Sequence, residues 1–147
     1  MILRPATPDD APALAAIHIL AMRTLTFLPQ LHTIEEAAVW MFETVLPTHQ
    51  VTVADVDGEA CGYIASSEGW IDQLYVHPDH HGRGVGGRLL ESVLAEGGTR
   101  QLWTFQQNAR ARAFYESRGF RAVEFTDGSG NEEKTPDVRY IWDGPAR

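Results

Sequence analysis

The chain has 147 residues, of which 44% are hydrophobic and 22% are charged, values that describe an ordinary globular protein. We expect a single domain over residues 1–147, because this length is enough for one proper hydrophobic core. The 20 acidic residues outnumber the 12 basic ones and give a formal net charge of −8, which disfavours nucleic acid as a partner.

No apolar run in the sequence approaches the length of a membrane span, and residues 1–5 lack the apolar stretch of a signal peptide. We therefore expect a cytoplasmic protein with no membrane partner. Cys61 is the only cysteine, so a disulfide framework and a thiolate metal site are excluded. We expect Cys61 to be a small buried residue in a strand.

The N-terminal third predicts one strand and two helices. Residues 2–6 are expected to form the strand, and Thr7, followed by a proline and two aspartates, marks the start of the first helix. His18 lies among apolar residues at helical spacing and is expected to be a core or cleft-edge histidine. The second helix begins at the capping box of residues 33–36 and is expected to end at Pro47.

Three strands should follow. Residues 51–56 and 60–66 alternate in strand fashion around Asp57-Gly58, a strong hairpin signal. A short turn then leads into a strand over residues 71–76, which Pro78 must end because proline has no N–H to donate. Short turns of this kind join antiparallel neighbours.

The segment after Pro78 predicts an anion-binding site at the start of a helix. Apolar spacing predicts a helix from about Gly84 to Glu96, and a helix leaves its first N–H groups without backbone partners at an end that carries partial positive charge. Four glycines in the six positions 82–87 let a phosphate approach those donors closely, and Arg83 among them and Arg88 after them add positive charge. A tight turn alone would explain only one or two of these glycines.

Two other phosphate motifs fit less well. Gly82, Gly84 and Gly87 satisfy the dinucleotide pattern G-x-G-x-x-G, but that pattern needs an acidic residue about 20 positions later. Residues 102–106 contain none, and no Gly-Lys-Ser or Gly-Lys-Thr occurs in the sequence. A dinucleotide-binding module and a P-loop are therefore disfavoured.

The last third should complete a mixed sheet. Residues 100–106 predict a strand parallel to residues 71–76, because a helix joins the two. Asn108 should cap a helix that Gly119 ends. Residues 120–125 and 138–142 predict a final antiparallel pair joined by a polar loop, so the chain is α/β.

Two stretches resemble the signatures of the GNAT family of N-acetyltransferases. His81-Gly82-Arg83-Gly84-Val85-Gly86 is similar to the acetyl-coenzyme A signature (Gln/Arg)-x-x-Gly-x-(Gly/Ala), except that His81 stands where glutamine or arginine is usual. NARARAFYESRGF, which begins at Asn108, is similar to Asn-x-x-Ala-x-x-Phe-Tyr-x-x-x-Gly-Phe. The resemblance implies a single-domain α/β GNAT-like fold. Its central sheet would be mixed and mostly antiparallel, flanked by about four helices, with splayed parallel strands at the cofactor site.

The resemblance also implies acetyl-coenzyme A as cosubstrate, with its pantetheine arm pairing with the backbone of one splayed strand and its pyrophosphate held by N–H groups of the glycine-rich turn. Asn108 would contact the pantetheine side, cap its helix, or do both. The residues expected to bind the cofactor are Leu74, Tyr75, Val76, His81, Gly82, Arg83, Gly84, Val85, Gly86, Gly87, Arg88, Asn108 and Tyr115.

Acetyl transfer to an amine needs a deprotonated amine and a proton for the departing thiolate. Tyr115 matches the family tyrosine beside the cofactor sulfur and is expected to donate that proton. Adjacent residues of a helix point about 100° apart, so Phe114 can be buried while Tyr115 faces the cleft. Asp72 is expected to be the base or to position water, on the same strand face as Leu74. Glu68 and the pair Glu132 and Glu133 are alternatives.

Two loops are expected to form the acceptor site. Phe27, Leu28 and Leu31 would form an apolar wall beside His32, and Glu132 and Glu133 would attract an ammonium group. The acceptor is then a small-molecule or peptide-like primary amine, favoured to be cationic. No metal is expected at His77, His80 and His81, which lie in a turn and include a phosphate-signature residue. A catalytically inactive coenzyme A sensor of the same fold remains the alternative function, and a homodimer is left open.

Overall fold

The computed structural model describes residues 1–144. One seven-stranded sheet has the order β1-β2-β3-β4-β5-β7-β6. Only β4 and β5 pair in parallel, which confirms the mixed, mostly antiparallel α/β fold. The strands are β1 (Ile2–Pro5), β2 (Gln50–Val56), β3 (Glu59–Ser67), β4 (Trp70–Val76), β5 (Arg100–Phe105), β6 (Arg121–Phe125) and β7 (Asp137–Trp142). The helices are α1 (Ala11–Arg23), α2 (Ile34–Trp40), α3 (Leu46–Thr48), α4 (Val85–Leu94) and α5 (Ala109–Glu116).

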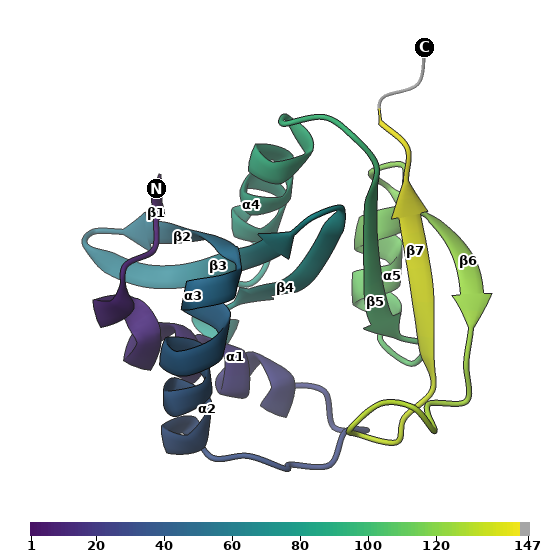
Figure 1. Ribbon diagram of the computed structural model, residues 1–147, viewed down its shortest axis with the longest axis horizontal. Helices are drawn as coiled ribbons and strands as arrows, with labels where there is room; N and C mark the ends of the chain where they lie inside the picture. Colours follow the sequence, from purple (N-terminus) through teal and green to yellow (C-terminus); the bar gives the residue numbers. More distant parts are fainter. Residues whose placement is uncertain (145–147) are drawn as a thin grey trace.

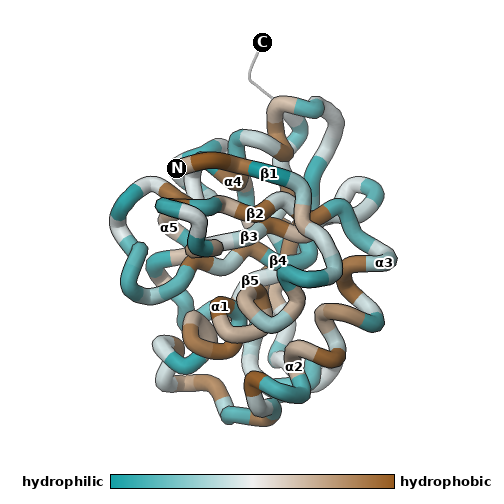
Figure 2. Tube along the Cα trace, turned by 90° about the vertical axis from the view of Figure 1, so that its left-hand side faces the viewer, coloured by the Kyte–Doolittle hydropathy of each residue, from teal (hydrophilic) through white to brown (hydrophobic). Residues whose placement is uncertain are grey.

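Helices cover both faces of the sheet, as the alternation of β2 and β3 requires. Val53 and Tyr63 are fully buried in a cluster with the residues of α1, whereas Ala54 and Ile64 are buried in a cluster with those of α4. Figure 2 shows hydrophobic residues among β2, β3 and β4 in the middle of the molecule, and also at its edge, at the N-terminal end of β1, where Met1 and Ile2 are exposed. Within residues 1–144, no helix is both long and apolar enough to cross a membrane.

The two parallel strands part almost at once. Their only paired residues are Trp70 and Gln101, next to a hydrogen bond from the Gln101 N–H to the Gly69 carbonyl of 2.8 Å. Beyond this point β4 and β5 diverge, as Figure 1 shows. The end of β4 therefore presents unpaired backbone groups towards the gap, and the predicted splay is confirmed.

A β-bulge at Asp72 corrects one expectation about strand faces. Ala65 pairs with Gln73 and Ser66 with Ile71, so Asp72 is an extra residue without a partner on β3. The bulge reverses the alternation, which places Ile71 and Leu74 on the α4 side of the sheet. Asp72 does not share the face of Leu74, because the period of two is broken between them.

The second helical segment also differs from the expectation. Pro47 does not end it: α2 continues through a π-helix over Met41–Val45 into α3, which runs to Thr48. The Leu46 N–H bonds to the Met41 carbonyl, and Pro47, which has no N–H to donate, is the second residue of α3. The Asp57-Gly58 hairpin is confirmed, with φ of 53° and 83° at its two residues.

Candidate functional site

A first cavity, here called the cofactor groove, has a volume of about 730 Å³ and lies between the end of β4, the glycine-rich turn and α5. Most of the predicted cofactor residues line it, but the side chains of Arg83 and Arg88 do not; both are exposed on the surface. The predicted residues that line the groove are Leu74, Tyr75, Val76, His81, Gly82, Gly84, Val85, Gly86, Gly87, Asn108 and Tyr115.

The N-terminus of α4 opens onto this groove. Gly84 is its N-cap with φ of 78°, a conformation that side chains disfavour. Gly86 has ordinary helical geometry, and a Cβ there would lie 3.6 Å from the Phe114 ring and 3.7 Å from Val76, inside the groove. A side chain at this position would therefore occupy the groove beside the first turn of α4, whose N–H groups lack helical partners and suit an approaching phosphate.

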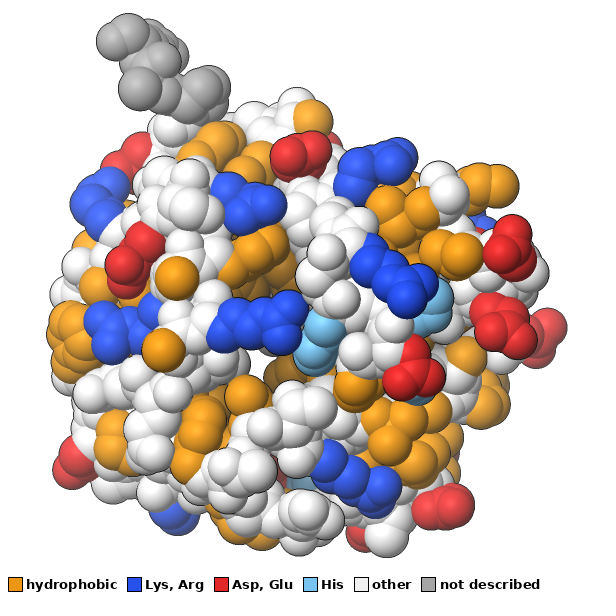
Figure 3. Space-filling model, turned by 180° about the vertical axis from the view of Figure 1, so that it is seen from behind, with side chains coloured by type: hydrophobic (Ala, Val, Ile, Leu, Met, Phe, Trp, Pro, Cys, Tyr) orange, Lys and Arg blue, Asp and Glu red, His pale blue; other side chains and the backbone are white. Residues whose placement is uncertain are grey.

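Basic side chains from α5 and the residues after it, not those of the glycine-rich turn, surround the groove. Arg110 and Arg118 line it together with Phe114, and the Arg118 guanidinium lies 4.1 Å from the centre of the Phe114 ring. Arginine and histidine side chains gather around a hollow in the face shown in Figure 3. Arg110, Phe114 and Arg118 recur every four positions, which puts them on one side of a helix. That spacing is the signal in the sequence that could have identified the two arginines.

His81, the departure from the family signature, has a defined structural role. Its Nε2 lies 2.8 Å from the Val76 carbonyl oxygen, and its Nδ1 lies 3.4 Å from Nη1 of Arg110. A carbonyl only accepts, so Nε2–H donates to Val76 and the unprotonated Nδ1 accepts from Arg110. His81 thereby ties the end of β4 to the start of α5 across the groove.

Tyr115 lies at the inner wall of the groove. Its ring packs among Phe114, Phe120 and Tyr140, and only 8% of the residue is exposed. Tyr115, and not Phe114 as predicted, is therefore the more buried of the two neighbours, and both line the groove. Its hydroxyl has no hydrogen-bond partner within residues 1–144, so the proton is available to a bound molecule. Burial, reinforced by nearby Tyr75, raises the pKa of Tyr115 above its ordinary value of 10, and the hydroxyl stays protonated at neutral pH.

Asn108 caps α5 as predicted. Its Oδ1 accepts a hydrogen bond of 3.1 Å from the Ala111 N–H, and the residue also lines the cofactor groove. The side-chain oxygen is committed to the helix end, which leaves the amide N–H groups of Asn108 for a ligand.

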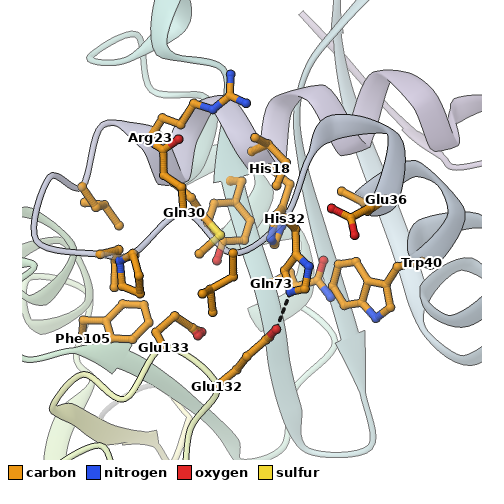
Figure 4. A pocket seen from close by; sticks show the side chains of 18 of the residues that line it. His18, Arg23, Gln30, His32, Glu36, Trp40, Gln73, Phe105, Glu132 and Glu133 are labelled. Carbon is orange, nitrogen blue, oxygen red and sulfur yellow. Dashed lines mark hydrogen bonds and ion pairs between the residues drawn. The ribbon is translucent and has the colours of Figure 1, made fainter.

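A second cavity, here called the acceptor pocket, has a volume of about 800 Å³ and lies on the α1 and α2 side of β4. Figure 4 shows His18, His32, Gln73 and Trp40 gathered at one part of its wall and Phe105 and Glu133 at another. Tyr75 lines both cavities. The acceptor pocket and the cofactor groove therefore meet at the end of β4.

The two loops predicted to form the acceptor site do meet. His32 and Glu132 form an ion pair across 100 positions of the sequence, and Figure 4 marks it with a dashed line. Leu28 and Leu31 line the acceptor pocket, whereas Phe27 lines the cofactor groove and packs against Phe105, 6.0 Å between ring centres.

Glu133 is the carboxylate that the pocket leaves without a partner. Its Oε2 is buried and has no hydrogen-bond partner within residues 1–144. Burial raises the pKa of Glu133, with the charge of neighbouring Glu132 adding to the effect. The charge of Glu133 also contributes, after burial, to raising the pKa of Tyr75 to about 12. A bound cation would compensate this carboxylate.

Asp72 lines the acceptor pocket but is held by two neighbours. Its Oδ2 lies 3.2 Å from Nε2 of His49 and accepts a 2.6 Å hydrogen bond from the Ser67 hydroxyl. The alternative base Glu68 lies exposed in the β3–β4 turn and lines neither cavity.

His77 and His80 do not form a metal cluster with neighbouring ligands. Their ring centres are 6.3 Å apart, and the part of the chain that the structure describes has no group of three or more His, Cys, Asp or Glu side chains able to hold a metal ion.

Trp40 and Gln73 are among the acceptor-pocket residues that the sequence did not predict, and His18 was expected only as a core or cleft-edge residue. They come from α2, β4 and α1, and no local pattern links them. The bulge at Asp72, which turns Gln73 towards this pocket, has no signal in the sequence.

The chain matches known acetyltransferases. The family model described as an acetyltransferase (GNAT) domain matches residues 47–122. An uncharacterised N-acetyltransferase of Archaeoglobus fulgidus is 37% identical over 98 residues, which are 56% of this chain and 66% of that relative, so the match spans about two thirds of the relative's length.

Solved structures share the fold. A GCN5-related N-acetyltransferase from Rhodopseudomonas palustris superimposes with a TM-score of 0.78 and 25% identity over 97% of this chain and 94% of that one. YncA, a putative acetyltransferase from Salmonella typhimurium solved with acetyl-coenzyme A, gives a TM-score of 0.76 and 20% identity over 100% of this chain and 95% of that one. With the splayed strands, the glycine-rich helix start and the family model in agreement, this chain belongs to the GNAT family of N-acetyltransferases.

Proposed function

We propose that the protein transfers the acetyl group of acetyl-coenzyme A to a primary amine of a cationic small molecule or peptide-like acceptor. The observation that carries this proposal is the meeting of the two cavities at Tyr75: one offers helix N–H groups and arginines to an anion, and the other offers the unpartnered carboxylate of Glu133 to a cation. The structural neighbour YncA, solved with acetyl-coenzyme A, supports the choice of cosubstrate.

The residues of the cofactor groove fit acetyl-coenzyme A. The N–H groups at the start of α4, with Arg110 and Arg118 beside them, would hold the pyrophosphate. The backbone groups of Leu74 and the N–H of Val76 would pair with the pantetheine amides, since the Val76 carbonyl already accepts from His81. Acetyl-coenzyme A supplies a thioester whose carbonyl accepts the amine and whose sulfur leaves. Tyr115, protonated and without another partner among residues 1–144, would give that sulfur its proton.

The acceptor pocket is suited to hold and prepare an ammonium group. Glu133 would bind it by a charge-assisted hydrogen bond, with the ring of Tyr75 and the apolar side chains of Leu28 and Leu31 around the acceptor's body. An ammonium must lose one proton before its lone pair can attack. Asp72, on the pocket wall with His49 behind it, is the proposed base for this first proton.

The test begins with calorimetry of acetyl-coenzyme A binding, followed by a thiol-release screen over primary amines. For an amine found in this way, Glu133→Gln should raise KM roughly tenfold or more, because the amide oxygen can still accept from the ammonium but the attraction between opposite charges is lost. The KM for acetyl-coenzyme A should stay unchanged. Glu91→Gln, an exposed carboxylate on α4 outside both cavities, is the matched control.

Two results would count against the proposal. If the acceptor KM of Glu133→Gln equals that of the parent at low salt, Glu133 has no part in binding the acceptor. If the parent binds acetyl-coenzyme A but acetylates no amine, the chain is a coenzyme A sensor and not an enzyme.

A further inference from the structure

A chain of hydrogen bonds runs behind the acceptor pocket and joins three elements. Nδ1 of His18, on α1, lies 2.9 Å from the Tyr63 hydroxyl on β3, and that hydroxyl lies 2.6 Å from Oε1 of Gln73 on β4. Tyr63 is fully buried, and Gln73 is only 9% exposed. The sheet therefore holds the ring of His18 in one orientation.

The direction of these bonds fixes the tautomer of His18. The amide oxygen of Gln73 only accepts, so the Tyr63 O–H donates to it. Burial raises the pKa of Tyr63, so its proton is present at neutral pH. The Tyr63 oxygen must then accept from Nδ1–H of His18, which leaves Nε2 without a proton and with a free lone pair.

Nε2 is open to the pocket where the acceptor would bind. Within residues 1–144 it has no hydrogen-bond partner, and it is not among the buried unpartnered atoms. The His18 ring packs edge-on against Tyr75, 4.4 Å between ring centres, and against Trp40 at 5.5 Å. Since Tyr75 lines both cavities, His18 lies next to the point where the two substrates would meet.

The surroundings of His18 keep it neutral. Burial, with a smaller contribution from the charge of His32, lowers the pKa of His18 to about 4. The groups around its ring are Tyr63 and Tyr75 from the sheet, Trp40 from α2 and His32 from the loop after α1. A neutral ring keeps its lone pair available and does not repel an ammonium group from the pocket.

We propose that His18 is a catalytic residue whose Nε2 accepts the proton that the acceptor nitrogen gives up as it bonds to the acetyl carbon, and that Tyr63 and Gln73 are positioning residues that hold the required tautomer. This inference rests on the proposed acetyl transfer, to which it adds a second proton acceptor. Asp72 would take the first proton, from the ammonium, and His18 the second.

The step balances. The nitrogen lone pair forms the bond to carbon and leaves the nitrogen positively charged, and its proton then passes to Nε2. The carbon–sulfur bond breaks with its electron pair on sulfur, which takes a proton from Tyr115. His18 is left as an imidazolium that still donates from Nδ1 to Tyr63. Of the two protons that Asp72 and His18 have taken up, one is replaced through solvent on the Tyr115 oxygen and the other is released through the pocket.

The first test reads the tautomer and needs no activity. Nitrogen-15 NMR of the protein labelled in its histidines should show His18 with a protonated Nδ1 and an unprotonated Nε2. In Tyr63→Phe the ring keeps its packing but loses its acceptor, so the Nε2–H form should appear. An Nε2–H tautomer in the parent overturns the inference, whatever the enzyme does.

The second test is kinetic. His18→Asn retains a side-chain N–H for Tyr63 but has no nitrogen base, so kcat should fall roughly 100-fold, the usual contribution of a general base, with the Kd for coenzyme A unchanged. Tyr63→Phe should lose part of kcat, because some of the His18 rings then carry the proton on Nε2. Parental kcat in a folded His18→Asn protein overturns the role. A parent with the Nδ1–H tautomer that acetylates no amine overturns the proposed function and, with it, proton transfer by His18.

Discussion

The burial of His18 predicts a specific loss of stability in acid. Its pKa lies at about 4 in the folded protein, against 6.5 for an exposed histidine. Below pH 6.5 the unfolded chain therefore binds a proton that the folded chain resists. The destabilisation from protonating His18 is absent above pH 6.5, the pKa of His18 in the unfolded chain. It lowers the free energy of unfolding progressively as the pH falls from 6.5 towards 4.

The size of the effect follows from the two pKa values. Linkage gives a loss of about 2 kcal/mol of unfolding free energy between pH 7 and pH 5, and about 3 kcal/mol by pH 4. His18 lies largely inside the protein, so solvent screening reduces this figure little. Urea unfolding of the parent and of His18→Asn at pH 7 and pH 5 measures it.

Other titrating groups contribute equally to the pH dependence of the parent and of His18→Asn, so their contributions cancel in the comparison. Asp10, whose pKa is lowered mainly by its hydrogen bond to Arg4, is one of them. The variant should lose about 2 kcal/mol less than the parent over this interval. Parallel pH dependences in the two proteins would show that His18 is not buried in a neutral form, and the tautomer argument would lose its basis.

Two further predictions concern proton transfer. Tyr115→Phe removes only the hydroxyl and should lower kcat by roughly ten- to ten-thousand-fold, with Kd for acetyl-coenzyme A unchanged in calorimetry; full activity would make Tyr115 a packing residue. Asp72→Asn should lower kcat by roughly tenfold or more while the melting temperature stays within a few degrees of the parent's, since Asp72 is exposed; an unchanged kcat would leave Asp72 only as the partner of His49 and Ser67.

The elements that the sequence predicted well are those set by local chemistry. Asp57 and Gly58 adopt the positive φ of a tight hairpin. The side chains of Thr33 and Glu36 cap the start of α2, and Gly84 takes the left-handed conformation needed at the start of α4. Each of these features depends on a few adjacent residues. The order of the two family signatures then identified the groove.

What could not be predicted depends on contacts between distant elements. The bulge that separates the faces of Asp72 and Leu74 arises from the pairing of β3 with β4, and an alternating pattern cannot show where one residue is inserted. The tautomer of His18 depends on Tyr63, 45 positions later. Arg118 reaches the groove because its side chain lies against Gly87 of α4, a contact between distant residues that the charges of Arg83 and Arg88 near the glycines do not reveal.

The central claim is that acetyl-coenzyme A binds at the start of α4, and one calorimetric comparison tests it. Gly86→Val places side-chain atoms in the groove at a residue with ordinary backbone geometry, whereas Gly130→Val adds them in open space away from it. The account predicts that the parent and Gly130→Val bind acetyl-coenzyme A alike. It predicts binding weaker by roughly 100-fold or more in a folded Gly86→Val protein, because charge-assisted hydrogen bonds to the phosphates are blocked. Equal affinity in all three proteins would contradict it.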